Sequence, residues 1–110
     1  MTTIDNAHQY CTLINVFTVA PEKQLELVEL LEEGTQKAMS KLPGFISANL
    51  HLSDDQKTVT NYAQWTTLQD YQNALKNLEA VQHMNQAAAM AIEFKPVTYT
   101  RIWTQHADTQ

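Results

Sequence analysis

Two polar side chains share one face of a predicted β-strand, and their types are suited to chemistry. The stretch TVTNYAQW (residues 58–65) has the β-branched and aromatic residues of a strand. Asn61 and Trp65 lie on the same face of it, because side chains four residues apart in a strand point the same way. Tyr71 follows in a predicted helix. These residues are either packed in a core or are the polar groups of a ligand pocket.

Other polar side chains interrupt the remaining predicted strands. Asn15 stands among apolar neighbours, His51 has Asn49 on its face, and Arg101 is the only arginine. Buried polar groups need hydrogen-bond partners, and for any one residue the backbone can supply them. Several such residues together favour a pocket with a few convergent polar groups. The register of the hairpin is not fixed by the sequence, so the faces of its two strands stay open.

Metal and cofactor sites find little support in the sequence. The chain has no nucleotide-binding glycine motif, no HExxH and no CxxC. Its histidines share no metal-ligand spacing: His8, His51, His83 and His106. Cys11 has no basic neighbour that would activate its thiol. We therefore expect no metal, flavin or haem.

The elements that must position these residues follow from the hydrophobic pattern. In order, the pattern predicts a strand at 11–19, a helix at 21–42, a hairpin of strands at 45–52 and 57–65, a helical segment at 68–91 with a break near Asn77, and a strand at 97–103. Thr67, followed by Asp70, resembles a capping box at the start of the second helical segment, and Pro96 is expected to end it. This βαββαβ order predicts an α+β, ferredoxin-like fold with a four-stranded antiparallel sheet. We expect a single domain over residues 1–110, with a core at about 12–104 and flexible termini.

The first strand is apolar on both faces, and this predicts an assembly. Leu13 and Phe17 point to one side, while Ile14 and Val16 point to the other. Two helices can cover only one face of the sheet. Because soluble monomers rarely expose a large apolar patch, we expect a homodimer whose sheets pack face to face.

Composition limits the partners and the compartment. The 110 residues include 7 basic and 12 acidic side chains, for a net charge of −5, and no basic cluster. Nucleic acid is therefore an unexpected partner. No apolar run reaches the roughly 18 residues of a membrane span, and no signal-peptide pattern is visible. With one cysteine, a cytoplasmic protein is expected.

The stretches INVFTV and NYAQW, the latter after ANLHLSDDQKTVT, resemble the antibiotic biosynthesis monooxygenase (ABM) family over about residues 12–104. The resemblance implies a dimeric α+β barrel. In its quinone-forming members, oxygen converts an anthrone-type phenol to a quinone without flavin, haem or metal. Asn61 and Trp65 match the family's strand pair, and Tyr71 and His51 match its helix tyrosine and strand histidine. The arginine of some members has no clear match, although Gln82 or Gln86 lies nearby.

The resemblance implies a small electron-rich aromatic substrate, anthrone- or quinol-like, together with O2. A deprotonated substrate of this kind can give one electron to oxygen without a cofactor. The amide of Asn61 and the indole N–H of Trp65 would then donate hydrogen bonds to the anion, while Tyr71 or His51 would move a proton. Further candidates for substrate binding are His51, Asn15, His83 and Arg101.

Two other functions remain as alternatives. The first is a non-enzymatic domain for ligand binding or stress response, in which Asn61 and Trp65 only shape the cavity. The second is a haem-degrading enzyme on the same fold, for which Asn15 and His83 are matching residues. The helix tryptophan of those enzymes would fall near Ala74, so this set is incomplete.

Overall fold

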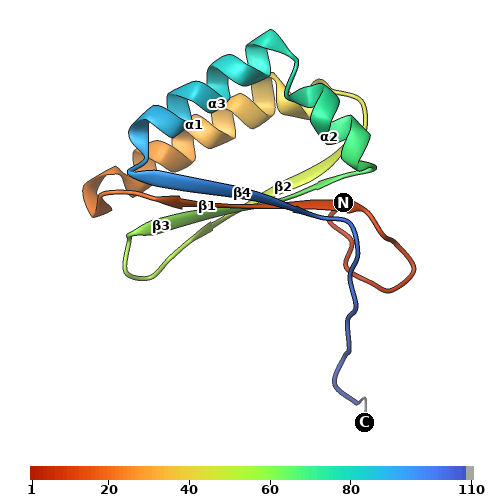
Figure 1. Cartoon of the computed structure of the whole chain (residues 1–110). Coiled ribbons are helices and arrows are strands. Elements are labelled where there is room, and N and C mark those ends of the chain that lie inside the picture. The colour runs from red at the N-terminus through yellow and green to blue at the C-terminus, as the bar shows by residue number, and fades with distance from the viewer. Residues whose placement is uncertain (109–110) are drawn as a thin grey trace.

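The computed structural model describes residues 1–108. Four strands form one sheet in the order β2-β3-β1-β4, with every neighbouring pair antiparallel. The helices all cover the same face of this sheet (Figure 1). The elements are β1 (Cys11–Thr18), η1 (Pro21–Lys23), α1 (Gln24–Lys37), η2 (Met39–Lys41), β2 (Phe45–Leu52), β3 (Thr58–Trp65), α2 (Leu68–Ala74), α3 (Leu78–Met90) and β4 (Glu93–Tyr99). The predicted α+β, ferredoxin-like fold is confirmed.

Side-chain caps divide the second helical segment where the sequence indicated a break. The hydroxyl of Thr67 accepts a hydrogen bond from the backbone N–H of Asp70 at 3.0 Å and so begins α2. The side-chain oxygen of Asn77 accepts one from the backbone N–H of Ala80, also at 3.0 Å, and begins α3. Each cap satisfies a backbone donor that has no partner within the helix. These two caps fix the direction of the elements that carry Tyr71 and His83.

The predicted last strand was placed too late in the chain. Helix α3 ends at Met90 and β4 begins at Glu93, so Pro96 lies inside the strand and does not end the helix. Pro96 is tolerated there because β4 is an edge strand, paired only with β1. The strand stops at Tyr99, and Arg101 therefore lies beyond the sheet. The predicted helix at 21–42 also differs, since η1 and η2 flank a shorter α1.

A β-bulge sets the faces of the hairpin. The pairing of β2 with β3 shifts between Phe45 and Ser47. Phe45 pairs with Trp65 and Leu50 pairs with Asn61, so these residues share the face that the helices cover. His51 pairs with Thr60 on the opposite face, which we call the outer face.

The core consists of two buried clusters on the helix-covered face. The larger contains Phe17, Val19, Leu27, Val28, Val59 and Ala87. The smaller contains Cys11, Trp65 and Ala74, with Phe45 and Tyr71 packed against it. Helices α1 and α3 come so close that a Cβ atom on Gly34 would lie 2.9 Å from the Cβ of His83. These contacts pack the helices as a layer against one face of the sheet.

The chain ends make specific contacts around the sheet. The backbone N–H of Thr3 donates to the side chain of Gln64 at 2.8 Å, and that side chain donates back to the Thr3 carbonyl at 2.7 Å. The Asn6 amide makes two bonds to the backbone of Thr104. Beyond this point the C-terminal segment runs away from the domain (Figure 1). Within residues 1–108, no helix is long and apolar enough to cross a membrane.

Candidate active site

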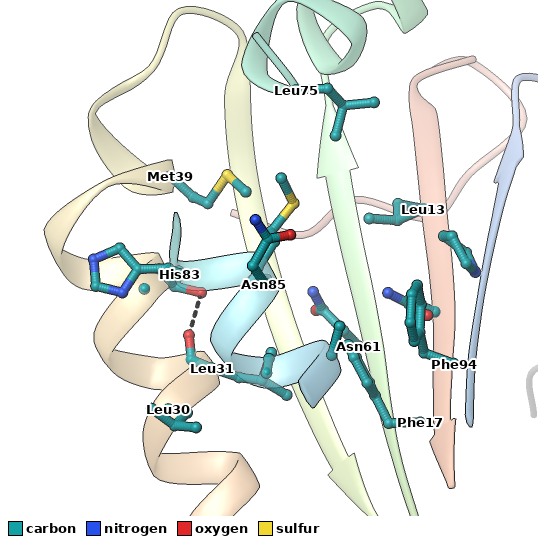
Figure 2. A pocket seen from close by; sticks show the side chains of 18 of the residues that line it. Leu13, Phe17, Leu30, Leu31, Met39, Asn61, Leu75, His83, Asn85 and Phe94 are labelled. Carbon is teal, nitrogen blue, oxygen red and sulfur yellow. Dashed lines mark hydrogen bonds between the residues drawn. The ribbon is translucent and has the colours of Figure 1, made fainter. Parts of the chain in front are cut away.

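A cavity of about 330 Å³ lies between the helices and the sheet. Figure 2 shows its wall from the sheet, with Leu13, Phe17 and Asn61, and its roof from α1, with Leu30 and Leu31. The lining is mainly apolar, and none of the described residues that form it is Lys, Arg, Asp or Glu. Its size and lining are those of a small-molecule site.

The structure brings the three principal candidates together at this cavity. Asn61, Trp65 and Tyr71 all line it. The rings of Trp65 and Tyr71 lie 6.2 Å apart between centroids, and Phe45 packs edge-on against Trp65 at 5.3 Å. Trp65 is only 2% exposed. Close packing therefore fixes the orientation of the indole before any ligand arrives.

Asn15 and Asn61 form a pair of amides on the cavity wall. They are directly opposite each other across β1 and β3, and both line the cavity. The side-chain oxygen of each is buried without a hydrogen-bond partner in the described part of the chain. A buried acceptor without a donor costs about 1–3 kcal/mol. Such a group in a cavity wall points to a ligand or water that would complete its hydrogen bonds.

Burial favours the protonated forms of Tyr71, which lines the cavity, and of Cys11, which lies in the same buried cluster. It raises the pKa of the Tyr71 hydroxyl, with a further contribution from the nearby Cys11 thiol. It also raises the pKa of Cys11. Both groups are therefore protonated at neutral pH. Tyr71 can donate a hydrogen bond or a proton, whereas Cys11 has no thiolate with which to act as a nucleophile.

His51 and Arg101 are not brought to this cavity. His51 is exposed on the outer face of the sheet, on the far side from the helices. Arg101 is exposed in the segment that follows β4. The bulge in β2 and the early end of β4 account for these positions, and neither feature was recognised in the sequence. The two residues have no geometric support as ligands of a substrate held here.

His83 lines the cavity, but its ring is turned away from the centre. In Figure 2 the imidazole lies beside α1, on the far side of the cavity from Asn61. A haem in this cavity would need His83 as its iron ligand, and the ring of His83 does not point toward the cavity that Asn15 lines. The tryptophan that such an enzyme carries on its helix would fall near Ala74. The residues present do not fit a haem group.

Sequence reasoning missed Asn85, which lines the cavity from α3. It is exposed and lies two residues beyond His83. The candidates Gln82 and Gln86 are exposed and do not belong to the lining. On a helical projection Asn85 lies beside Ala88, at the edge of the face that carries the cavity-lining Met84 and Ala88, so the apolar pattern alone gave only a weak signal for it. Among residues 1–108, no group of three or more His, Cys, Asp or Glu side chains could hold a metal ion.

Comparison with known proteins assigns the family. Residues 11–89 match the family model described as antibiotic biosynthesis monooxygenase. The chain belongs to this family. It is 48% identical over 71 residues to the tetracenomycin-F1 monooxygenase of Streptomyces glaucescens. The match covers 64% of this chain and 63% of that protein, so the alignment leaves more than a third of the relative unmatched.

Solved structures of ABM proteins share the fold. A monooxygenase from Streptomyces coelicolor, crystallised with nanaomycin D, is 28% identical with a TM-score of 0.80; the match covers 90% of this chain and 93% of that one. The cofactor-independent oxygenase SnoaB from Streptomyces nogalater is 22% identical with a TM-score of 0.76; the match covers 87% and 96%. At its lower identity, SnoaB supports the fold alone.

Proposed function

We propose that this ABM protein is an oxygenase that uses O2 to oxidise a small electron-rich aromatic compound, anthrone- or quinol-like, without flavin, haem or metal. The observation that carries the proposal is the convergence of Asn61, Trp65 and Tyr71 on one apolar cavity. The names of the S. glaucescens and S. coelicolor relatives support oxygenase chemistry.

The protein's contribution begins with the substrate anion. Loss of a proton from an anthrone carbon or a phenol leaves an electron-rich anion with charge on oxygen. The Asn61 amide and the Trp65 indole N–H carry donors that can stabilise this oxyanion. Because the cavity is apolar, such hydrogen bonds are stronger there than in water.

The remaining steps need only O2 as a second reactant. The anion gives one electron to O2, and the resulting substrate radical and superoxide combine to form a carbon–oxygen bond. Uptake of a proton gives a hydroperoxide. Removal of the second proton from that carbon and departure of water leave a carbonyl, so one oxygen atom enters the quinone and the other leaves as water. Tyr71 is protonated and can supply the proton to the peroxide.

The test is oxygen consumption by the purified protein with anthrones and hydroquinones. With an anthrone we expect one O2 consumed for each quinone formed, with one labelled oxygen atom in the product and the other in water when isotopic O2 is used. A hydroquinone whose two oxygens are already present should give its quinone and hydrogen peroxide, with no labelled atom in the product. If a test compound binds in the cavity but oxygen consumption does not exceed the uncatalysed rate, the chain is assigned to the alternative, a ligand-binding domain.

Trp65→Phe separates an indole that donates a hydrogen bond from one that only forms a wall. Phenylalanine keeps most of the packing against Phe45 and removes the N–H. We expect turnover to fall about 100-fold or more, the usual effect of losing one oxyanion donor. Trp103→Phe is the matched control, because Trp103 is 77% exposed and lies outside the cavity. If both variants keep full turnover, the indole N–H has no catalytic role.

A further inference from the structure

We propose that ligands enter and leave the cavity between the helices and the edge strand β4, and that the ring of Phe94 limits the rate of this passage. The inference goes beyond the proposed function, because it concerns the route to the cavity and not the reaction inside it. It applies equally to an oxygenase and to a ligand-binding domain. Phe94 would select ligands by their width.

The first observation is where the lining of the cavity is open to solvent. Four of the described lining residues are exposed: Leu75, Asn85, Phe94 and Pro96. They come from the C-terminal end of α2, from α3 and from β4. Every other described lining residue is buried or half-buried. The four exposed residues therefore form the rim of an opening on the β4 side, which we call the mouth.

The second observation is that backbone contacts close the cavity at two other places. Along α1, Gly34 comes so close to α3 that an added Cβ atom would lie 2.9 Å from the Cβ of His83. Beyond the end of α3, the backbone N–H of Ile92 donates to the Thr18 carbonyl of β1 at 2.7 Å and ties the turn before β4 to the sheet. Passage at either place would require packed backbone to separate, whereas passage at the mouth requires only side chains to move.

The third observation is the position of Phe94, which carries the largest side chain of the rim. Phe94 pairs with Phe17 across β4 and β1, and their rings stack at 6.2 Å between centroids. Phe17 is buried, but Phe94 is 48% exposed and lies on a strand with only one neighbour. In Figure 2 its ring lies beside these two strands at the edge of the cavity. Because an exposed side chain changes rotamer within nanoseconds, the ring can move aside while the backbone stays in place.

Quenching of Trp65 fluorescence by acrylamide measures passage through the mouth. Trp65 lines the cavity and is buried, so this small uncharged quencher must enter the cavity to reach it. A Trp103→Phe background leaves Trp65 as the only tryptophan. The measurement needs neither a bound ligand nor turnover. If the protein consumes no oxygen, the oxygenase proposal fails while the entrance can still be tested.

Phe94→Cys changes the width of the mouth in both directions. Before modification, the smaller side chain should raise the rate constant of quenching about twofold or more, because collisions with Trp65 are less hindered. N-cyclohexylmaleimide, which is bulky and not aromatic, then modifies the exposed thiol, whereas the buried Cys11 does not react. The modified protein should be quenched about twofold or more slowly than the protein that keeps Phe94.

Leu25→Cys is the matched control, because Leu25 is also apolar and exposed but lies on α1 outside the lining. Its modification should leave quenching unchanged. Asn85→Cys offers a second blocking position on the helix side of the mouth, so the route is tested even if Phe94→Cys does not fold.

Unchanged quenching in folded Phe94→Cys, before and after modification, would overturn the role of Phe94. Unchanged quenching after modification at both mouth positions would overturn the route itself, and so would an equal effect of modifying Leu25→Cys. Absence of quenching in every protein would also overturn the route, since the mouth would then be closed to a molecule as small as acrylamide.

Discussion

At the scale of a single residue, Asn61 lowers the stability of the fold and gives the cavity a polar group that can bind a ligand. Its side-chain oxygen is buried in the cavity wall without a partner, although the residue directly opposite, Asn15, carries an identical amide. An apolar side chain at either position would remove that cost. The pair is therefore better explained by a ligand than by packing.

Asn61→Ala tests this at the residue scale. Because the lost oxygen has no partner, we expect the free energy of unfolding to stay within about 1 kcal/mol of its original value or to rise. Turnover should fall about 100- to 1,000-fold, as for the loss of one oxyanion donor. Urea unfolding and oxygen uptake measure the two effects. A loss of several kcal/mol in stability would assign Asn61 a structural role instead.

Tyr71 gives a prediction about pH. Burial raises the pKa of its hydroxyl above the ordinary value, which is about 10. In the unfolded chain this group loses its proton first, so the unfolded state binds fewer protons and stability falls as pH rises past that value. The buried Cys11, whose pKa is also raised, acts in the same direction from its ordinary value of about 8.5.

We therefore expect the free energy of unfolding to decline as the pH rises above about 8.5, and to decline less steeply above about pH 10 in Tyr71→Phe. Urea unfolding at a series of pH values measures both slopes. At neutral pH the same variant should keep its fold and lose turnover, because phenylalanine cannot supply the proton. Identical slopes in the two proteins would mean that Tyr71 is not held protonated by the fold.

At the scale of elements, α2 positions Tyr71 and depends on one cap. The Thr67 hydroxyl accepts from the backbone N–H of Asp70 at 3.0 Å, and α2 runs only from Leu68 to Ala74. We expect Thr67→Ala to lower stability by about 1 kcal/mol and Thr67→Ser to restore most of it. Thermal unfolding measures the change. Turnover should fall in Thr67→Ala and recover in Thr67→Ser, because the first turn of α2 fixes the position of Tyr71.

The same elements show how far a sequence can be interpreted. Regular strands were predictable from alternation: β2 was placed at its observed bounds, and β3 differed by one residue. The break at Asn77 and the cap at Thr67 were also predictable, because their side chains act on backbone groups only three residues away. Asn61 and Trp65 shared a face as expected, since they lie within one unbroken strand.

The sequence-based predictions that were wrong concern features that depend on contacts between segments far apart in the chain. The bulge near Phe45 arises from pairing with β3, and it decides which residues of the hairpin share a face. Pro96 looked like the end of a helix until its place on an edge strand was known. The partnership of Asn15 with Asn61 likewise depends on a register that hydrophobic patterns do not give.

At the scale of the whole molecule, the helices leave the outer face of the sheet without a second layer (Figure 1). This face carries Ile14, Val16 and Tyr62 from the two central strands, together with Val97 and Tyr99 from β4. Val16 is 38% exposed and Tyr99 is 47% exposed. The N-terminal residues Thr2 and Thr3 form hydrogen bonds on this face with Gln64, Ser47 and Asn49. A second copy of the chain would bury the rest, so we propose a homodimer.

Tyr62→Asp tests the dimer, because Tyr62 lies on the outer face between Ile14 and Asn49. Association would take the new carboxylate out of water and into an apolar contact, so we expect the dimer to dissociate at micromolar concentration. Leu25→Asp is the control: it also places a charge at an exposed apolar position, 67% exposed, but on α1 and away from the sheet. Light scattering after size exclusion should give a 25 kDa particle, about twice the 12.5 kDa chain, for the unsubstituted protein and for Leu25→Asp, and a chain-sized particle for Tyr62→Asp. If the unsubstituted protein and both variants are all folded monomers, the outer face is exposed to solvent and the proposed dimer is wrong.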